Sequence, residues 1–178
     1  MTEVPVYCLF CRSGREERVM DRLRRMGMSP MAPQVRKAVA GASGSKGGKL
    51  ARLMPGYVFF DAEQSPDWHE VRQIPDVLKV LAYSDGEFAL RSEDLKYVEW
   101  LKSLGGTVEV SLAVRAGTRL EFVSGPLREL NGSIRRVNSK RRVVEVQFGQ
   151  EGSLLQNVWC SFEYLQTNTD AEEAVRNK

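Results

Sequence analysis

The stretch "RLMPGYVFFD", residues 52–61, decides the fold because it joins a turn to a strand that is apolar on both faces. Its Pro-Gly pair predicts a turn, and the four strand-forming residues "YVFF" follow directly. Because side chains alternate along a strand, Tyr57 and Phe59 point to one face while Val58 and Phe60 point to the other. Both faces therefore need cover, either from the same chain or from a partner.

The composition is that of a globular protein. The chain has 178 residues, of which 42% are hydrophobic and 28% charged, enough for one mid-sized domain or two small ones. No apolar run approaches the roughly 20 residues that span a bilayer. The first residues, "MTEVPVYCLFC", lack the basic region and the cleavage site of a signal peptide. We therefore expect a cytoplasmic protein without a membrane segment.

Charge is unevenly distributed although the net charge is only +3. Residues 8–52 contain 11 Lys or Arg against 3 Asp or Glu, whereas residues 53–110 contain 5 against 11. Residues 113–166 are basic again, with 8 against 5. Basic segments of this kind favour a polyanion such as nucleic acid as a partner, although a solvated surface gives the same pattern.

The amino-terminal pattern predicts a strand over residues 4–11 followed by an amphipathic helix. Ser13 and Glu16 have the spacing of a capping box, and Gly27 is expected to end the helix. The buried stripe is formed by Val19, Leu23 and Met26, at offsets of four and three. Arginines recur on another face and form a ridge, which is either solvated or directed at phosphates. The ridge consists of Arg15, Arg18, Arg22 and Arg25.

The remaining pattern up to residue 104 completes an α+β sandwich, with helices on a mostly antiparallel sheet. A second strand is expected over residues 30–39, and the Gly/Ser/Lys-rich residues 40–49 are expected to form a flexible loop. A short helix starts at Ser65 or Asp67 and stops at Pro75. The pattern then predicts a strand over residues 76–83, an Asp85-Gly86 hairpin turn, a strand over residues 87–90, and a helix from Ser92 to about Leu104.

The character of the chain changes near its middle. Residues 1–104 form one expected domain and residues 105–116 a linker that carries little strand. Residues 117–167 contain four or five short alternating segments, which predict a small β-barrel. Residues 168–178 are a polar tail.

The sequence lacks the motifs of an enzyme. His69 is the only histidine and has no glycine elbow or nucleophile near it. No nucleotide-binding glycine motif is present. Cys8 and Cys11, three apart in a strand, point to opposite faces, and Cys160 is the third cysteine. We therefore expect buried structural cysteines, no cofactor, no metal site and no catalysis.

Basic residues also crowd the predicted barrel. They lie in two loops and the strands that join them, where small barrels often bind nucleic acid. A soluble rim is the alternative. The cluster consists of Arg128, Arg135, Arg136, Lys140, Arg141 and Arg142.

Three motifs together resemble the NusG family of transcription factors over residues 4–166. "MPGYVFF" followed by "WHEVRQIPDVLKVL" resembles the signature of the family's amino-terminal (NGN) domain. "VYCLFCRSGREERVMDRL" is similar to the first strand, turn and helix of that domain. "RLEFVSGPLRELNGSIRRV", with Asn131-Gly132, resembles the KOW motif. The resemblance implies an NGN-type sheet with flanking helices, followed by an SH3-like barrel.

The resemblance also implies partners. One sheet face is expected to be uncovered and to receive the clamp helices of RNA polymerase, in an apolar depression. His69 and Arg72 would lie near the opposite side of the polymerase cleft. The factor would bridge the cleft and promote elongation, with the ridge and the preceding Arg12 near the non-template DNA strand. The depression would be formed by Phe10, Met54, Pro55, Tyr57 and Phe59.

One departure favours a specialised relative. The general factor engages the termination factor Rho and a ribosomal protein through a Phe-Gly-Arg loop, but here the loop reads "QFGQ", with Gln147 and Gln150. The start of the chain is similar to the LoaP group of antiterminators, which implies processive antitermination by a monomer whose KOW barrel reads a nascent RNA hairpin. A general NusG factor and a ribosome-associated KOW protein remain alternatives.

Overall fold

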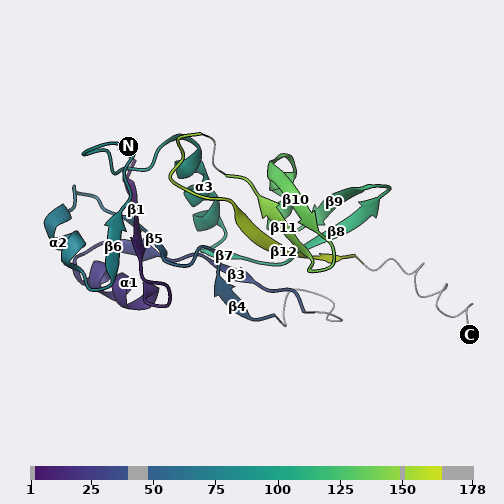
Figure 1. Ribbon diagram of the computed structural model, residues 1–178, viewed down its shortest axis with the longest axis horizontal. Helices are drawn as coiled ribbons and strands as arrows, with labels where there is room; N and C mark the ends of the chain where they lie inside the picture. Colours follow the sequence, from purple (N-terminus) through teal and green to yellow (C-terminus); the bar gives the residue numbers. More distant parts are fainter. Residues whose placement is uncertain (1–2, 40–47, 149–150, 166–178) are drawn as a thin grey trace, which may run out of the picture.

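The computed structural model describes residues 3–39, 48–148 and 151–165. An amino-terminal α/β part and a carboxy-terminal β part lie side by side along the long axis of the molecule (Figure 1). The elements are, in chain order, β1 (Val6–Cys11), α1 (Glu16–Arg25), β2 (Ser29–Met31), β3 (Gln34–Arg36), β4 (Leu50–Arg52), β5 (Tyr57–Asp61), α2 (Trp68–Gln73), β6 (Val77–Val80), α3 (Ser92–Ser103), β7 (Thr107–Val108), β8 (Ser111–Ala116), β9 (Arg119–Ser124), the 3-10 helix η1 (Pro126–Ser133), β10 (Ile134–Asn138), β11 (Val143–Val146) and β12 (Val158–Tyr164).

The amino-terminal part is built on a four-stranded sheet with the order β2-β5-β1-β6. Every pairing in it is antiparallel, as the sequence predicts. The central pair joins β1 to β5 and sets Cys8 opposite Phe59. An α+β fold is therefore confirmed for this part.

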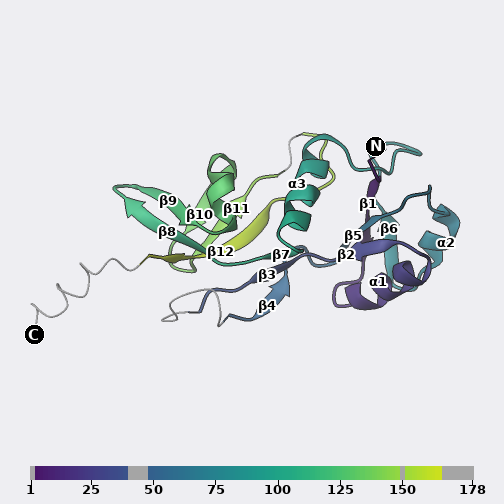
Figure 2. The ribbon, with the colours of Figure 1, turned by 180° about the vertical axis from the view of Figure 1, so that it is seen from behind.

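Both faces of β5 are covered. Val58 and Phe60 belong to a cluster with residues of α1 and α2, while Phe59 belongs to a second cluster with residues of α3. The alternation predicted for the strand is thus confirmed. The expectation of an uncovered face over Phe59 is wrong, because α3 lies on the opposite side of the sheet from α1 (Figure 2).

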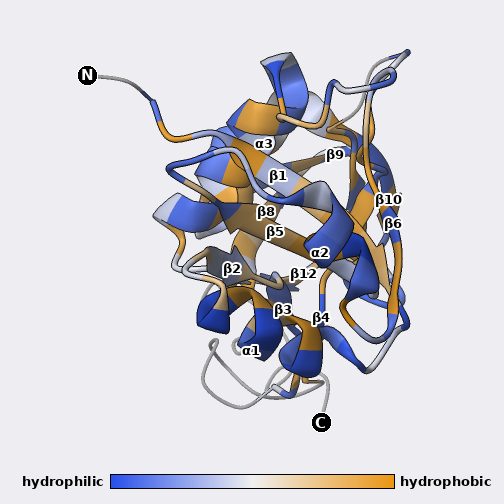
Figure 3. Cartoon of the chain, turned by 90° about the vertical axis from the view of Figure 1, so that its left-hand side faces the viewer, coloured by the Kyte–Doolittle hydropathy of each residue, from blue (hydrophilic) through white to orange (hydrophobic). Residues whose placement is uncertain are grey.

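Helix α1 packs by its apolar stripe but starts differently from the prediction. Val19 and Leu23 are fully buried, and the helix turns its hydrophilic face outward (Figure 3). Arg15 is the N-cap residue, and no side chain forms a capping hydrogen bond. The expected capping box of Ser13 and Glu16 is therefore wrong. The Glu16 side chain instead turns inward. At α2 the expected cap is confirmed, because Asp67 accepts from two backbone N–H groups.

The expected single strand over residues 30–39 is broken into β2 and β3. Ala32 and Pro33 separate them, since Pro has no N–H for the ladder. Strand β3 joins a separate three-stranded sheet, with antiparallel β4 on one side and parallel β7 on the other. Residues 40–47 of the expected loop lie outside the described residues.

The predicted hairpin forms its turn but lacks its second strand. The N–H of Glu87 donates to Ser84, and the N–H of Tyr83 donates to Glu87. Residues 87–90 have no strand assignment. The N–H of Leu90 donates to Val6 instead, so this segment ends against β1 and leads into α3.

The carboxy-terminal part is a five-stranded sheet with the order β10-β11-β12-β8-β9. Strand β8 begins at Ser111, so it occupies much of the segment expected to be a linker. Its pairing with β12 is parallel, and the other pairings are antiparallel. Gly125 has a φ of 86°, and a Cβ there would lie 2.7 Å from the Ser111 Cα. Glycine is therefore needed where β9 passes into η1.

The described residues show the expected cysteines and no metal cluster. Cys8, Cys11 and Cys160 are free and buried, and Cys8 and Cys11 belong to the clusters on opposite faces of the sheet. No group of three or more His, Cys, Asp or Glu side chains could hold a metal ion among the described residues. None of the described helices has the length and apolar character needed to cross a membrane.

Candidate protein and nucleic-acid interfaces

A small recess lies beside β5, where the resemblance implies the depression. Its rings are Phe10, from β1, and Tyr57, from β5, with centroids 5.2 Å apart in an edge-on contact. Both rings are half-buried and Pro55 is exposed. Met54 is buried, and its Sδ lies 3.7 Å from the Tyr97 hydroxyl on α3. Four residues that the sequence analysis named, Phe10, Met54, Pro55 and Tyr57, thus line this recess, and Leu53 and residues 156–158 complete it.

Phe59 does not line it. It shares a face with Tyr57, but its exposed fraction is 0%. Phe59 belongs to the same buried cluster as Tyr97, Val98 and Leu101 of α3. A partner that entered the recess would therefore touch Tyr57, while Phe59 would only support the recess from beneath.

The second wall of the recess comes from the carboxy-terminal part. Gln156, Asn157 and Val158 face Phe10 and Tyr57 across a volume of about 300 Å³. Buried residues of both parts form a single hydrophobic cluster. The recess therefore lies between the two parts of the chain.

Asp94, at the start of α3, holds the segment that forms this wall. Its carboxylate accepts from the N–H groups of Leu154, at 2.9 Å, and Leu155, at 3.4 Å. It also accepts from the Tyr83 hydroxyl at 2.8 Å. The Asp94 residue is 2% exposed, so these three donors satisfy a carboxylate that water barely reaches.

Two further contacts join the two parts. The Phe148 ring stacks on Tyr97 with centroids 3.7 Å apart, and the Trp100 centroid lies 5.6 Å from Phe148. Arg36 on β3 forms a two-pronged ion pair with Glu109, with N···O distances of 2.6 and 3.1 Å. Phe148 belongs to the "QFGQ" loop, so its ring is engaged within the chain. Gln147 of this loop is exposed.

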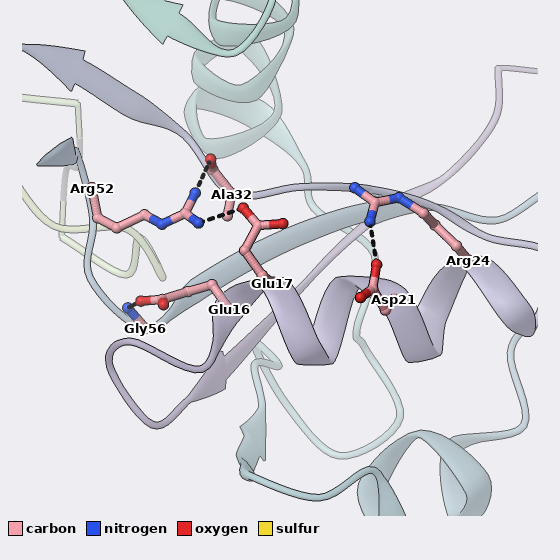
Figure 4. Close-up of polar contacts among 7 residues, drawn as sticks. All are labelled: Glu16, Glu17, Asp21, Arg24, Ala32, Arg52 and Gly56. Atoms are coloured by element: carbon pink, nitrogen blue, oxygen red, sulfur yellow. Dashed lines mark hydrogen bonds and ion pairs between the residues drawn. The ribbon is translucent and has the colours of Figure 1, made fainter. Parts of the chain in front are cut away.

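Glu16 fixes the Pro-Gly turn that borders the recess. The residue is 1% exposed, and its Oε1 accepts from the Gly56 N–H at 2.8 Å. The Gly56 carbonyl accepts from the Cys11 N–H at 2.7 Å. The turn is therefore tied to both α1 and β1 (Figure 4). The signal that could have found this role is an acid on the side of α1 that packs on the sheet.

Glu17 and Arg52 extend the same tie. Arg52 donates to the Glu17 carboxylate at 2.6 Å and to the Ala32 carbonyl at 3.1 Å, as Figure 4 shows. The Arg52 side chain is only 21% exposed. Arg52 therefore links β4 to α1 and to the end of β2. The arginine ridge then remains as the exposed basic surface of α1.

The arginine ridge is exposed along its whole length. Arg15, Arg18, Arg22 and Arg25 follow α1, and Arg12 lies in the preceding turn. Within the described part of the chain, Arg18 is the ridge residue that forms an ion pair, with Asp76 at 3.9 Å. The neighbouring Arg24 is instead paired with Asp21 at 2.8 Å. The ridge is thus available to an anionic partner.

His69 and Arg72 lie together on α2, away from the recess. Both are exposed. Gln73 lies 2.7 Å from the His69 Nε2, and the Arg72 guanidinium lies over the Phe88 ring at 5.4 Å. The recess and this helix are therefore two separate surfaces of the chain.

The basic cluster of the carboxy-terminal part gathers on the β10–β11 hairpin. Arg135, Lys140 and Arg141 are exposed and Arg142 is half-buried with a φ of 53°. Arg136 is exposed and approaches Glu145 at 3.5 Å. Arg128 lies apart from these residues, on η1. Gln150, and the side chains of Asn131 and Gly132, lie outside the described residues.

A larger cleft lies elsewhere. It has a volume of about 720 Å³, between the end of α1 and the start of α2. Arg25 is its only residue from the predicted sites, and Glu63, Asp67 and Glu70 make its lining acidic. Its position and charge do not fit the apolar contact predicted from the sequence.

Comparisons with known proteins agree with this architecture. The family model described as transcription termination factor nusG matches residues 6–98, which is more than half of the chain. The transcription termination/antitermination protein NusG of Thermus thermophilus is 27% identical over 112 residues, which cover 56% of this chain and 61% of that protein. The chain thus covers less than two thirds of that relative.

A solved structure supports the fold. The structure reported as domain interaction in Thermotoga maritima NusG matches with a TM-score of 0.50 at 20% identity, covering 88% of this chain and 92% of that one. NusG-family proteins are transcription factors that interact with RNA polymerase and are not enzymes. Since the family model covers the whole sheet from β1 to most of α3, the chain belongs to the NusG family.

Proposed function

We propose that this protein is a transcription elongation and processive antitermination factor of the LoaP type. It binds RNA polymerase through an NGN-type domain, residues 1–104, and nascent RNA through a KOW barrel, residues 117–167, joined by residues 105–116. The observation that carries the proposal is the aromatic recess of Phe10 and Tyr57 in a chain of the NusG family.

The recess suits the tip of a coiled coil. Half-buried aromatic rings beside an exposed proline give a firm apolar contact that loses little side-chain entropy on binding. The clamp helices of the polymerase are the partner that the family resemblance implies. Because Gln156 to Val158 form one wall, the partner must displace this segment or bind beside it. Polymerase binding then replaces the contact of residues 156–158 with the recess. The difference in affinity between these two contacts decides which one forms.

The other surfaces have roles in the same complex. His69 and Arg72 lie on α2, which contributes no residue to the recess, as a bridge across the polymerase cleft requires. The exposed arginine ridge serves the non-template DNA strand through phosphate contacts. The β10–β11 hairpin serves RNA, and the "QFGQ" stretch that replaces the general factor's Phe-Gly-Arg loop follows β11 in the sequence.

A pull-down of core RNA polymerase with and without ribonuclease tests the proposal. Tyr57→Ala and Phe10→Ala should each weaken polymerase capture about 10-fold, which is the effect of losing an aromatic anchor of about 1.4 kcal/mol. Leu78→Ala is the matched control, because Leu78 is 56% exposed and lies outside the recess. Undiminished capture by folded Tyr57→Ala would refute the recess. Ribonuclease-sensitive capture of ribosomes in place of polymerase would favour a ribosome-associated role.

A further inference from the structure

An arginine–tyrosine pair lies at the end of the carboxy-terminal sheet. Arg115, near the end of β8, donates from Nη2 to the Tyr164 hydroxyl, at the end of β12, at 2.9 Å. The Arg115 guanidinium also lies over the Tyr164 ring, 5.5 Å from its centroid. The two strands are parallel and adjacent, with Tyr164 in register with Ala113. Two segments far apart in the sequence thus build one polar and aromatic group.

The β10–β11 hairpin brings more positive charge to the same end. Its turn follows Asn138, and β11 pairs with β12 from Val143 to Val146, so the turn lies beside the end of β12. The pKa of Tyr164 is lowered by hydrogen bonds from Ser139 and Arg115 and by the positive charges of Arg115 and Arg142. Side chains of the β10–β11 turn and of β8 therefore both reach the Tyr164 hydroxyl.

A second arginine–tyrosine pair shows what a structural version looks like. Arg91 lies 4.3 Å from the centroid of Tyr83 in the amino-terminal part. Glu87 neutralises this arginine at 3.3 Å, and the Tyr83 hydroxyl donates to Asp94. The pKa of Tyr83 is raised to about 12, mainly by burial. In that pair, both partners contact acidic side chains of the same chain, Glu87 and Asp94.

The pair at the end of the carboxy-terminal sheet has no such acid within the described part of the chain. Among the described residues, Arg115 forms no ion pair, and it is exposed. One of its five N–H donors is used by Tyr164, and the others are left for an acceptor. The Tyr164 ring and hydroxyl restrain the Arg115 guanidinium. An anion that binds there therefore costs little additional side-chain entropy.

We propose that Arg115 and Tyr164 form the centre of an RNA-binding site at this end of the barrel, with Arg142 beside them. Arg115 and Arg142 bind the phosphates of an unpaired RNA segment, and a splayed base stacks on the Arg115–Tyr164 pair. This inference rests on the proposed function and locates its RNA contact, with Arg115 and Tyr164 as residues that the sequence did not indicate. The basic residues of the hairpin then flank the site and give it general affinity for the RNA backbone.

Fluorescence anisotropy with the full chain tests this. The probe is a fluorescein-labelled RNA stem-loop with a pyrimidine-rich loop, titrated over a series of KCl concentrations. Arg115→Ala should weaken binding about 10-fold and lower the slope of log K against log salt by about one. Tyr164→Ala should weaken binding about 10-fold, because a stacking surface is lost. Tyr164→Phe, which keeps the ring, should lose only about threefold.

The matched control is Arg91→Ala, which removes the other arginine of an arginine–tyrosine pair and should leave RNA affinity unchanged. If the wild-type chain binds the RNA and both Arg115→Ala and Tyr164→Ala bind it equally well, this site is refuted and the proposed function stands. If the wild-type chain binds no RNA while it still captures polymerase, the RNA part of the proposed function fails together with this site. Equal affinity for the corresponding DNA stem-loop would refute RNA as the ligand class.

Discussion

The two faces of the amino-terminal sheet are covered in different ways. The face of Val58 and Phe60 is closed by α1 and α2, which follow β1 and β5 closely in the chain. The face of Phe59 is closed by α3 and, beyond it, by residues of the carboxy-terminal sheet. The second face retains the aromatic recess at Phe10 and Tyr57. The first face therefore serves folding, whereas the second also carries the contact that we propose RNA polymerase replaces.

Phe60→Ala should give the largest effect and only on stability. Phe60 is 1% exposed, and deleting a buried phenyl ring costs about 3 to 5 kcal/mol. Tyr57→Ala should cost much less, because Tyr57 is half-buried, while it should weaken polymerase binding. Urea denaturation followed by circular dichroism measures the difference. A loss for Tyr57→Ala as large as that for Phe60→Ala would contradict the distinction between the two faces.

Gly56→Ala tests the turn that borders the recess. Gly56 has a φ of 87°, and an added Cβ would lie 2.6 Å from Phe10 Cε2 and 2.7 Å from the Cys11 carbonyl oxygen. Strain in the backbone and overpacking together should cost about 3 kcal/mol. Gly14→Ala is the control, since Gly14 has a φ of 84° but no atom within 4 Å of its Cβ position. It should cost only about 1 kcal/mol in the same urea experiment.

If both alanine variants lost the same stability, crowding at the recess would play no part. If Gly56→Ala kept its stability but lost polymerase binding, the turn would matter only for recognition.

Local signals predicted most of the fold. The apolar period of α1, the Asp67 cap of α2 and the alternation in β5 each depend on neighbours in the sequence. Errors arose where a distant segment decided the outcome. Glu16 has the spacing of a capping residue, yet its carboxylate binds the Gly56 N–H across 40 positions. Residues 87–90 form no second hairpin strand, because Leu90 bonds to Val6 of the distant β1.

The recess was only partly predictable, because some of its contacts also depend on distant segments of the chain. The resemblance supplied Phe10 and Tyr57, and strand parity set Tyr57 and Phe59 on one face. Neither could show that α3 covers Phe59 or that Gln156 to Val158 form the second wall, because these contacts join elements about 40 to 150 residues apart. The pairing of Arg115 with Tyr164 was hidden likewise, since it depends on the parallel pairing of β8 with β12.

Asp94→Ala should loosen the second face without disturbing the first. It leaves the N–H groups of Leu154 and Leu155 unpaired, at a cost of about 2 kcal/mol. Because the segment they belong to forms one wall of the recess, the variant should bind polymerase more tightly and be cleaved faster by a protease near residue 154. Glu93→Ala is the control, since Glu93 is exposed and pairs only with Lys96. Unchanged cleavage in Asp94→Ala would show that Asp94 does not hold the segment.

Alkaline pH should have the smallest effect, again on the second face. The pKa of Tyr83 is raised to about 12, first by burial and also by its hydrogen bond to Asp94. Since the folded protein holds this proton more tightly than the unfolded chain, the stabilisation is complete below pH 10 and is lost as pH rises towards about 12. Protease cleavage near residue 154 should therefore increase over this window. Tyr83→Phe, which cannot ionise, should show a smaller rise in cleavage with pH. If the wild-type chain and Tyr83→Phe had the same pH profile of cleavage, Tyr83 would play no part in the contact that closes the recess.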